Sequence, residues 1–260
     1  MRWAFQRLLR LVRLWCVAWV LLGVVGCGAA FGATAAPFIF GANAEPQAFG
    51  VRWGTLILSE AFRRLGMPMQ IVHYPMARYA AMLDSGEIDG DPSRIYDYGA
   101  AHPNLIRVEE SIIDMGFVMY AAKPDIKLKN LEQLRTSGWA VEYQRGVLFC
   151  ENKLKEVVPQ DSLSSISSGE QGLRKLLAGR TDVYCDLETS MRRYLNSPEF
   201  KDNTRLFKVF HLATLPTYPY LHPKHAALAP RLAAILKQLK AEGLVEAYRV
   251  QVEKDLKWTR

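Results

Sequence analysis

The amino-acid sequence predicts an α/β fold with parallel strands, built as two similar lobes. After Pro37, short apolar runs alternate with amphipathic helical segments, which is typical of strands joined by crossover helices. One phrase also occurs twice: residues 82–91 (MLDSGEIDGD) and residues 176–186 (LLAGRTDVYCD) both lead from leucine through glycine to an aspartate, Asp89 or Asp182, and a further acid. A helix that ends at glycine and turns directly into a parallel strand explains both copies and predicts one lobe around each.

The length and charge of the chain limit the classes of function. The 260 residues, half of them hydrophobic, suffice for a packed core. The net charge is +7, but four arginines lie within the first 35 residues, and the remainder carries 29 basic against 26 acidic residues. Such an interspersed surplus is typical of a solvated surface and argues against a nucleic-acid partner.

The first 35 residues have the composition of an export signal. A basic start is followed by an uncharged run over residues 14–31 and by Ala33-Thr34-Ala35, a site of the kind that signal peptidase cleaves. Residues 24–27 (VVGC) instead resemble a lipoprotein signal in which Cys27 becomes the lipidated first residue, and the uncharged run is just long enough for an uncleaved anchor. All three alternatives place the rest of the chain outside the cytoplasm, in the periplasm.

Export would determine the redox environment of the two cysteines that follow the signal. Cys150 and Cys185 would meet an oxidising compartment, where two thiols are candidates for a disulfide. Two buried thiols that act as small apolar groups are the alternative. Both interpretations stay open at this stage.

The first series of elements begins directly after Pro37. Residues 38–42 (FIFGA) are expected to form a strand, and residues 54–65 a helix whose apolar side chains recur at i, i+3, i+4 and i+7 before Gly66. The other elements expected before residue 124 are a strand over 69–74, a helix over 78–83 that ends at Gly86, a strand opened by Asp89, and strands over 105–110 and 115–123.

The second series begins after a polar segment over residues 123–138. Its helix over residues 170–179 has a leucine stripe and ends at Gly179. The other expected elements are strands over 139–143, 163–166 and 181–186, a helix from about Val147, and two terminal helices separated by Gly243, the second running through Leu256.

The order of these signals resembles the bacterial extracellular solute-binding proteins of family 3, the amino-acid-binding type. The resemblance covers the chain after Pro37 and rests on LDSGEIDG, YAAKP, KNLEQLRTSGWAVEYQRG, GLRKLLAGRTDVYCD and LKQLKAEGLVEAYRV, in that order. It implies a two-lobed periplasmic-binding-protein-like fold of type II, with a mostly parallel sheet in each lobe. Residues 37–121 and 217–260 would form lobe 1 and residues 122–216 lobe 2, with crossovers near 120–123 and 215–218. A ligand would bind between the lobes, at the carboxyl ends of the strands.

The sequence departs from this family where an amino acid would be recognised. The family usually carries an arginine about a dozen residues after the aspartate that corresponds to Asp89, and here that position falls near Ala101, with no arginine. The segment before it reads DPSRIYDY rather than serine-rich. The acid of the second lobe that normally holds the α-amino group is displaced, since Asp186 and Glu188 flank its place. The resemblance therefore does not by itself identify an ordinary amino acid as the ligand.

Cationic side chains are the leading candidates for ligand binding. Arg94, next to Ser93, lies in the segment expected to face the cleft, where a guanidinium could form a fork onto a carboxylate. Arg78 faces either the cleft or solvent. Arg145 precedes a helix start, which also favours anions. Removing Arg94 is expected to weaken binding with a much smaller effect on folding.

Acidic and aromatic candidates complete the predicted site. Asp186 and Glu188 could bind a cationic group or cap the helix that follows them. Tyr74 and Phe49 could stack on a ligand, although aromatic residues at strand ends more often belong to the core. Residues 222–225 (HPKH) have metal-like spacing without a third ligand nearby, so neither a metal nor a cofactor is expected.

The leading functional hypothesis is a monomeric extracytoplasmic binding protein, without enzymatic activity. It would capture a small polar, carboxylate-bearing molecule between its lobes and present it to an ABC-type permease or a membrane sensor. It would meet the membrane only through its signal or a lipid anchor. The alternatives are a ligand sensor for a signalling partner and a dehydratase that acts on a prephenate-like acid. In that enzyme Glu188 would be the general acid, and Arg94 and Arg78 would hold substrate carboxylates.

Overall fold

The computed structural model describes residues 36–42 and 46–257. The chain divides into residues 1–36 and residues 37–260, and the second unit contains the α/β body. The export signal expected over residues 1–35, including the lipidation site at Cys27, lies outside the described residues. Within those described, no helix has the length and apolar character needed to cross a membrane.

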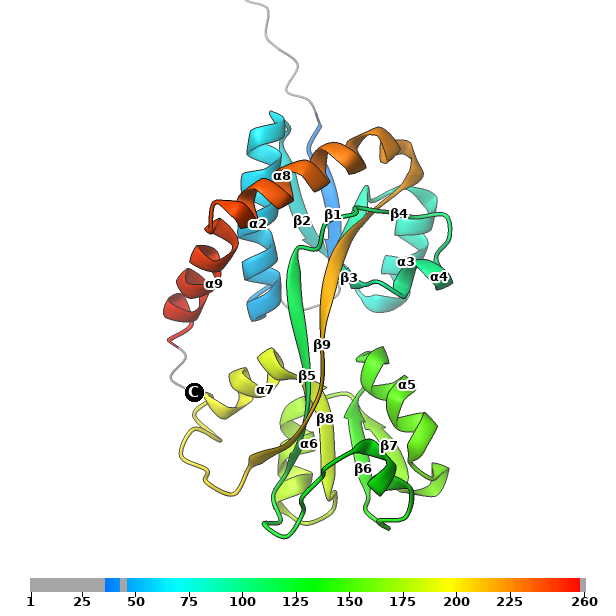
Figure 1. Cartoon of the computed structure of the whole chain (residues 1–260), viewed down its shortest axis with the longest axis vertical. Helices are drawn as coiled ribbons and strands as arrows, with labels where there is room; N and C mark the ends of the chain where they lie inside the picture. The colour runs from blue at the N-terminus through cyan, green and yellow to red at the C-terminus, as the bar shows by residue number, and fades with distance from the viewer. Residues whose placement is uncertain (1–35, 43–45, 258–260) are drawn as a thin grey trace, which may run out of the picture. The chain divides into compact units, whose positions relative to one another are not determined.

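The elements alternate between strands and helices along residues 37–260 (Figure 1). Gly66, Gly86, Gly179 and Gly243 all adopt positive φ at or just after helix ends, as their positions in the sequence predict. The first lobe contains β1 (Phe38–Ala42), α2 (Phe49–Leu65), β2 (Met69–His73), α3 (Met76–Ser85), β3 (Gly90–Ile95), α4 (Tyr98–Ala101) and β4 (Ile106–Arg107).

The remaining elements build the second lobe and return to the first (Figure 1). These are β5 (Ile113–Ala121), η1 (Leu131–Arg135), β6 (Val141–Gln144), α5 (Leu148–Val157), η2 (Gln160–Ser162), β7 (Leu163–Ile166), α6 (Gly169–Leu177), β8 (Val183–Leu187), α7 (Glu188–Leu195), β9 (Phe207–Leu221), η3 (Pro223–Leu228), α8 (Ala229–Ala241) and α9 (Leu244–Asp255).

Hydrogen bonds connect the strands in the order β2-β1-β3-β9-β5-β8-β6-β7, with β4 beside β9. Strand β1 pairs in parallel with β2 and β3, and β6 pairs in parallel with β7 and β8. The long strands β5 and β9 run antiparallel between these two parallel sets and connect them (Figure 1). The predicted fold class, two lobes of mostly parallel sheet flanked by helices, is confirmed.

Strands β5 and β9 pair with each other from Ile113 opposite Thr217 to Ala121 opposite Phe207. Two register shifts interrupt this ladder and leave Leu212 and Val209 of β9 without an opposing residue in it. Such bulges bend a strand and increase its local twist.

The buried side chains form separate cores for the two lobes. Helices α8 and α9 pack on α2 in one core, and the side chains of α5, β6 and β8 fill another. Phe117, Met119 and Ala121 of β5 belong to the second-lobe core, although the expected boundary places them in lobe 1. The predicted lobe boundaries at residues 121 and 217 therefore remain a prediction.

The repeated phrase has a structural explanation in Asp89 and Asp182. The Oδ2 atom of Asp89 accepts a hydrogen bond from the backbone N of Ile39 at 2.7 Å, and that of Asp182 accepts one from Ala140 at 2.9 Å. In return, each aspartate donates its own backbone N to the carbonyl oxygen of that same residue at 2.8 Å. Lys123 pairs with Asp182. Each aspartate therefore fixes the start of its own strand against the start of a neighbouring one.

The histidine-rich segment over residues 222–225 binds the first of these aspartates. His225 Nε2 lies 2.7 Å and Lys224 Nζ 2.8 Å from Asp89 Oδ1. Burial acts to raise the pKa of Asp89, but the hydrogen bonds from Lys224, Ile39 and His225 outweigh it and lower the pKa overall. Among residues 36–42 and 46–257, no group of three or more His, Cys, Asp or Glu could hold a metal ion.

Strand β9 is the main element that the sequence analysis did not predict. Pro216 and Pro219 interrupt its sequence, and proline is unusual in a central strand because it cannot donate to the ladder. The strand nevertheless lies between β3 and β5. The carbonyl of Pro219 remains an acceptor and receives the backbone N of Val108 at 2.9 Å. The predicted crossover near 215–218 lies in the second half of this 15-residue strand.

The structure contains a disulfide between Cys150 on α5 and Cys185 on β8. Both residues are fully buried, and their Cα atoms are 6.1 Å apart, within the range that a disulfide requires. Of the two interpretations that the sequence leaves open, the structure therefore contains the disulfide.

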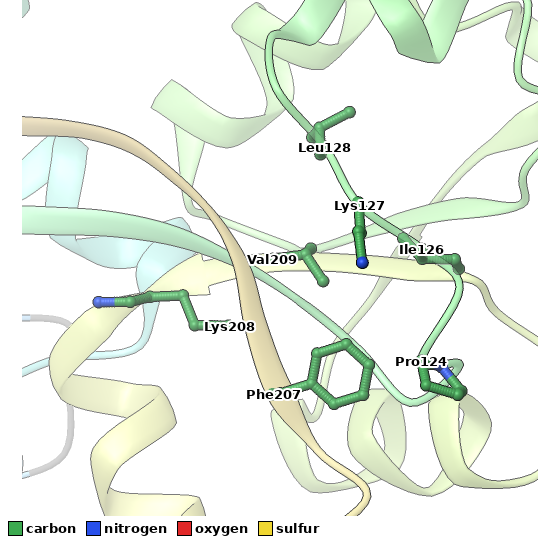
Figure 2. Close-up of a pocket in the computed structure, with 7 residues that line it drawn as sticks. All are labelled: Pro124, Ile126, Lys127, Leu128, Phe207, Lys208 and Val209. Atoms are coloured by element: carbon green, nitrogen blue, oxygen red, sulfur yellow. The ribbon is translucent and has the colours of Figure 1, made fainter.

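A small cavity of about 430 Å³ lies where the start of β9 meets the segment after β5 (Figure 2). Phe207 lies beside Pro124 and Ile126 there, while the ammonium of Lys208 points away and pairs with Glu188 at 3.0 Å. The cavity lining contains no acid. It belongs to the edge of the second-lobe core and contains none of the predicted ligand-binding residues.

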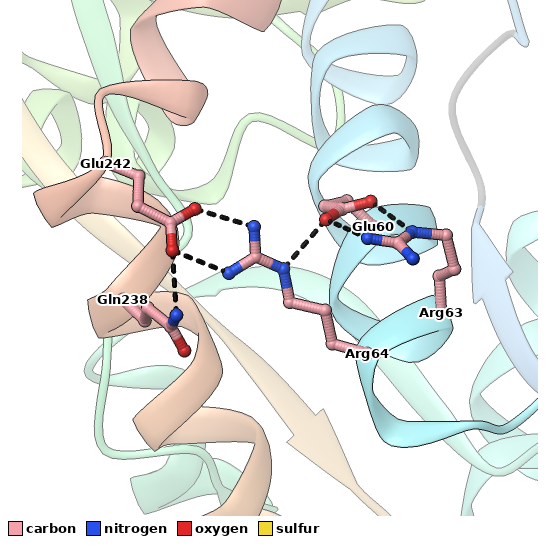
Figure 3. A network of polar contacts seen from close by, with 5 residues as sticks. All are labelled: Glu60, Arg63, Arg64, Gln238 and Glu242. Atoms are coloured by element: carbon pink, nitrogen blue, oxygen red, sulfur yellow. Dashed lines mark hydrogen bonds and ion pairs between the residues drawn. The ribbon is translucent and has the colours of Figure 1, made fainter.

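A polar network joins α2 to α8 (Figure 3). Arg64 donates to Glu60 on its own helix at 2.7 Å and forms two bonds to Glu242, at 2.9 and 2.6 Å. Arg63 also binds Glu60, at 2.7 and 2.8 Å, without reaching the neighbouring helix. Hydrogen bonds from Arg63 and Arg64 lower the pKa of Glu60 to about 2.

This network offers a matched pair of substitutions. Arg64→Ala should lower the melting temperature more than Arg63→Ala, because only Arg64 connects residues far apart in the sequence through a bidentate pair. Thermal unfolding at low salt measures the difference, and added salt should reduce it. Equal effects of the two substitutions would contradict this role.

Candidate functional site

A cavity of about 960 Å³ lies between the two lobes of residues 37–260. Its lining comes from the carboxyl ends of β1, β3, β6 and β8 and from the starts of α2, α5, α6 and α7. Of the predicted ligand residues, the structure brings together four at this cavity: Ser93, Arg94, Arg145 and Asp186. Open α/β sheets bind ligands at such strand ends, so this cavity is the candidate site.

Arg94 is held at the cavity by a buried carboxylate. A register shift in β3 sets Pro92 and Ser93 out of the ladder, so that Asp91 Oδ1 accepts the backbone N of Ser93 at 2.9 Å. Asp91 Oδ2 accepts Arg94 Nε at 2.5 Å and also the hydroxyl of Tyr79. The Asp91 side chain is 3% exposed and the Arg94 side chain 25%. The sequence analysis did not anticipate this partner.

Aromatic rings surround the Arg94 guanidinium. Its central carbon lies 5.5 Å from the ring centroid of Tyr79 and 5.0 Å from that of Tyr98. Burial acts to lower the pKa of Arg94, but Asp91 and the two tyrosines outweigh it and raise the pKa above its usual value. The cation is therefore fixed in position and permanently charged.

Tyr98 and His102 form a flat wall that the sequence analysis missed. Both line the cavity, and their rings stack with centroids 4.1 Å apart at 24°. Burial raises the pKa of Tyr98 to about 12, so its hydroxyl remains a donor at neutral pH. The sequence carries one signal for this wall. Tyr98 and His102 are four residues apart, a spacing that brings two rings together on a helix, and Tyr98 follows Arg94 by four residues.

Asp186 at the end of β8 is the buried acid of the opposite wall. It is 1% exposed, and its oxygens accept the Tyr184 hydroxyl at 2.9 Å and the backbone N of Leu187 at 2.7 Å. Burial raises the pKa of Asp186 to about 7, against the opposing effect of these hydrogen bonds and of the Arg193 charge. A substantial fraction of this carboxyl is consequently protonated at neutral pH.

Stability should therefore depend on pH through Asp186. The carboxyl has an ordinary pKa of about 3.9 in the unfolded chain, so between about pH 4 and 7 the folded state retains a proton that the unfolded state has lost. The free energy of unfolding should fall as pH rises through this window, by up to about 1.4 kcal/mol per pH unit from this group. Asp186→Asn should remove that fall, and urea unfolding at pH 5 and pH 8 measures it. Parallel pH profiles of parent and variant would contradict the assignment.

Further charges of the second lobe line the cavity near Asp186. Arg193 lies 3.5 Å from Glu170 and 4.6 Å from the Tyr194 ring centroid. Arg145, which is exposed, donates its backbone N to Ile166 at 2.8 Å and follows directly after β6. Arg193 was not predicted, because its position on the cavity side of α7 depends on how that helix packs.

Four predicted ligand residues do not line the cavity. Arg78 is exposed on α3, and Tyr74 packs among the core residues around Tyr79. Phe49 is buried, with its ring 5.7 Å from that of Trp53. Glu188 pairs with Lys208 at 3.0 Å. Their assignment to ligand binding rests on the sequence alone.

Comparison with known proteins identifies a relative in a bacterium. No family model matches it. A protein of Shewanella oneidensis, described as uncharacterized, is 37% identical over 207 residues, which are 80% of this chain and 78% of that protein.

Several solved structures share the fold at low sequence identity. A histidine kinase sensor domain with similarity to periplasmic binding proteins has a TM-score of 0.67 at 18% identity, over 83% of this chain and 95% of that one. ArtJ of Geobacillus stearothermophilus, an arginine-, lysine- and histidine-binding protein, has a TM-score of 0.63 at 15% identity, over 85% and 100%. A mutant of the T. maritima protein ArgBP has a TM-score of 0.62 at 18% identity, over 84% and 93%.

Proposed function

This chain belongs to the same family as the uncharacterized Shewanella oneidensis protein and has the two-lobed fold of periplasmic binding proteins, and from these findings we propose that it captures a small carboxylate-bearing molecule outside the cytoplasm. The ligand would bind in the cavity of about 960 Å³ between the lobes. Binding would bring the lobes together, with residues 37–121 and 217–260 moving against residues 122–216.

The observation that carries the proposal is the setting of Arg94. Its Nε is engaged by Asp91 at 2.5 Å and its guanidinium lies near two tyrosine rings, so the side chain is held in one place before any ligand arrives. A guanidinium held in this way binds a carboxylate with little further loss of side-chain entropy. Tyr98 adds a polar group on the same wall, whereas the Ser93 hydroxyl donates to Thr217 Oγ1 at 2.7 Å.

A membrane protein would read the liganded state. An ABC-type permease is one candidate partner and a membrane sensor is the other. The similarity to a histidine kinase sensor domain supports the sensor, and the similarity to ArtJ and ArgBP supports a solute-binding role. The dehydratase alternative has less support, because its acid, Glu188, does not line the cavity and pairs with Lys208 at 3.0 Å.

A thermal-shift screen of small acids, amines and amino acids tests the proposal. At least one carboxylic acid should raise the melting temperature of the purified protein, because a ligand that binds only the folded state stabilises it. Esters or amides of the same acid should not. A screen in which no acid raises the melting temperature, or in which amines alone do so, would contradict a carboxylate-binding site at Arg94.

A further inference from the structure

One side of the cavity presents an exposed leucine. Leu148, the first residue of α5, is 56% exposed and lines the cavity. Among the described residues only Tyr96 and Val250 are comparably exposed large hydrophobic side chains, and neither lines the cavity. Phe149 follows Leu148 in the cavity lining, with its ring centroid 4.6 Å from that of Phe117.

Strand β5 extends this apolar surface across the cavity. Ile113, Met115 and Phe117 alternate along the strand and therefore share one face, and all three line the cavity. Ile95 from β3 and Val147 before α5 add to it. Arg94 lines the cavity from β3 of the first lobe and Asp186 from β8 of the second. A wall of this extent can bury a substantial apolar body.

The buried carboxylates of the cavity are already occupied by donors of the protein itself. Asp91 accepts from Arg94, Ser93 and Tyr79. Asp186 accepts from Tyr184 and the backbone N of Leu187. A ligand ammonium group at either buried acid would have to compete with these bonds; Asp97, Glu156 and Glu170, which are less buried, also line the cavity.

We propose, on the basis of the proposed function, that the ligand is an amphipathic acid whose carboxylate binds Arg94 and whose alkyl or aryl body packs against Leu148, Phe149 and Phe117. The sequence predicts a small polar molecule; the apolar side of the cavity, with its exposed leucine, favours this different class. The cavity, at about 960 Å³, has room for a body of several carbons in addition to the carboxylate.

A series of straight-chain acids tests this inference directly. Butyrate, hexanoate, octanoate and 4-phenylbutyrate are titrated into the purified protein by calorimetry. Each buried methylene should tighten binding about fourfold, so that hexanoate binds roughly fifteenfold tighter than butyrate. Norleucine differs from hexanoate by an α-ammonium group alone and should bind more weakly than hexanoate.

A matched pair of exposed apolar residues supplies the control. Leu148→Asn should weaken hexanoate binding about fivefold relative to the parent protein, because part of the methylene contact is lost. Val250→Asn replaces a side chain of similar exposure, 50%, on α9 and outside the cavity lining, and should leave the affinity unchanged. Both variants should keep the parent melting temperature, since neither side chain is buried.

The outcomes separate the ligand class from the binding function itself. If hexanoate binds no tighter than butyrate, if norleucine binds tighter than hexanoate, or if Leu148→Asn leaves the gain per methylene intact, the amphipathic class is wrong and acid binding stands. If no member of the series binds but another acid of the thermal-shift screen does, the amphipathic class is wrong and the proposed function stands; if no acid of either set binds, both fail.

Discussion

Replacing Arg94 by alanine should weaken carboxylate binding by roughly 2 to 5 kcal/mol, the range for losing one partner of a buried, hydrogen-bonded charge pair. It should also lower the free energy of unfolding, which differs from the expectation drawn from the sequence. Asp91 is 3% exposed and would lose its cationic partner at 2.5 Å, keeping only the Tyr79 hydroxyl and the Ser93 backbone N. Breaking a fully buried pair costs about 3 to 5 kcal/mol, and the partial exposure of Arg94 places the expected loss near 2 kcal/mol.

A double substitution separates these two effects. Asp91→Asn combined with Arg94→Ala removes the buried charge together with its partner, so most of the lost stability should return while ligand affinity stays low. Urea unfolding and calorimetry of the same samples measure the two quantities. Arg94→Ala with full affinity, or affinity restored by the double substitution, would refute the assignment of Arg94 as the carboxylate-binding residue.

Removing the Cys150–Cys185 disulfide should cost about 3 to 4 kcal/mol of folding free energy. The bridge joins residues 35 positions apart, and closing a loop of this length restricts the unfolded chain by that amount in the chain-entropy model. It also ties α5, which bears Leu148, to β8, which bears Asp186. Unfolding in urea with and without a reductant measures the loss.

Cysteine-to-alanine substitutions provide the control for the disulfide. Cys150→Ala combined with Cys185→Ala should be destabilised to a similar degree as the reduced protein and should no longer respond to reductant. A parent protein whose two thiols react with maleimide in the absence of reductant would contradict the bridge. So would equal stability of the oxidised and reduced forms.

Most of the fold follows from local patterns in the sequence. Apolar runs bounded by glycines at helix ends predict both series of strands and helices, because a left-handed cap and the spacing of apolar residues are short-range features. The full extent of β9 could not be predicted in this way, since Pro216 and Pro219 argue against a central strand. What places β9 there is pairing with β3 and β5, which are distant in the sequence.

Only those residues of the candidate site that lie at the ends of strands could be predicted from the sequence. Arg94, Arg145 and Asp186 follow or end strands, and the carboxyl ends of parallel strands converge on one cavity. Arg193 and Leu148 lie on helices, and the side of a helix that faces a cavity depends on tertiary packing. For the same reason the apolar side of the site, and with it the inferred ligand class, came from the structure and not from the sequence.

The ladder between β5 and β9 also determines the mechanical work of bringing the lobes together. These two strands pair along most of their shared length, so any rotation of one lobe against the other must twist them as a single ribbon. In this ribbon Leu212 and Val209 have no partner in the ladder, so each marks a bulge. A bulge increases the twist of the strand at its own position. The local twist of the ribbon should therefore be greatest beside Phe117 and Tyr120, where β5 belongs to the second-lobe core. If a ligand brings the lobes together, its binding free energy is reduced by the work of turning this ribbon.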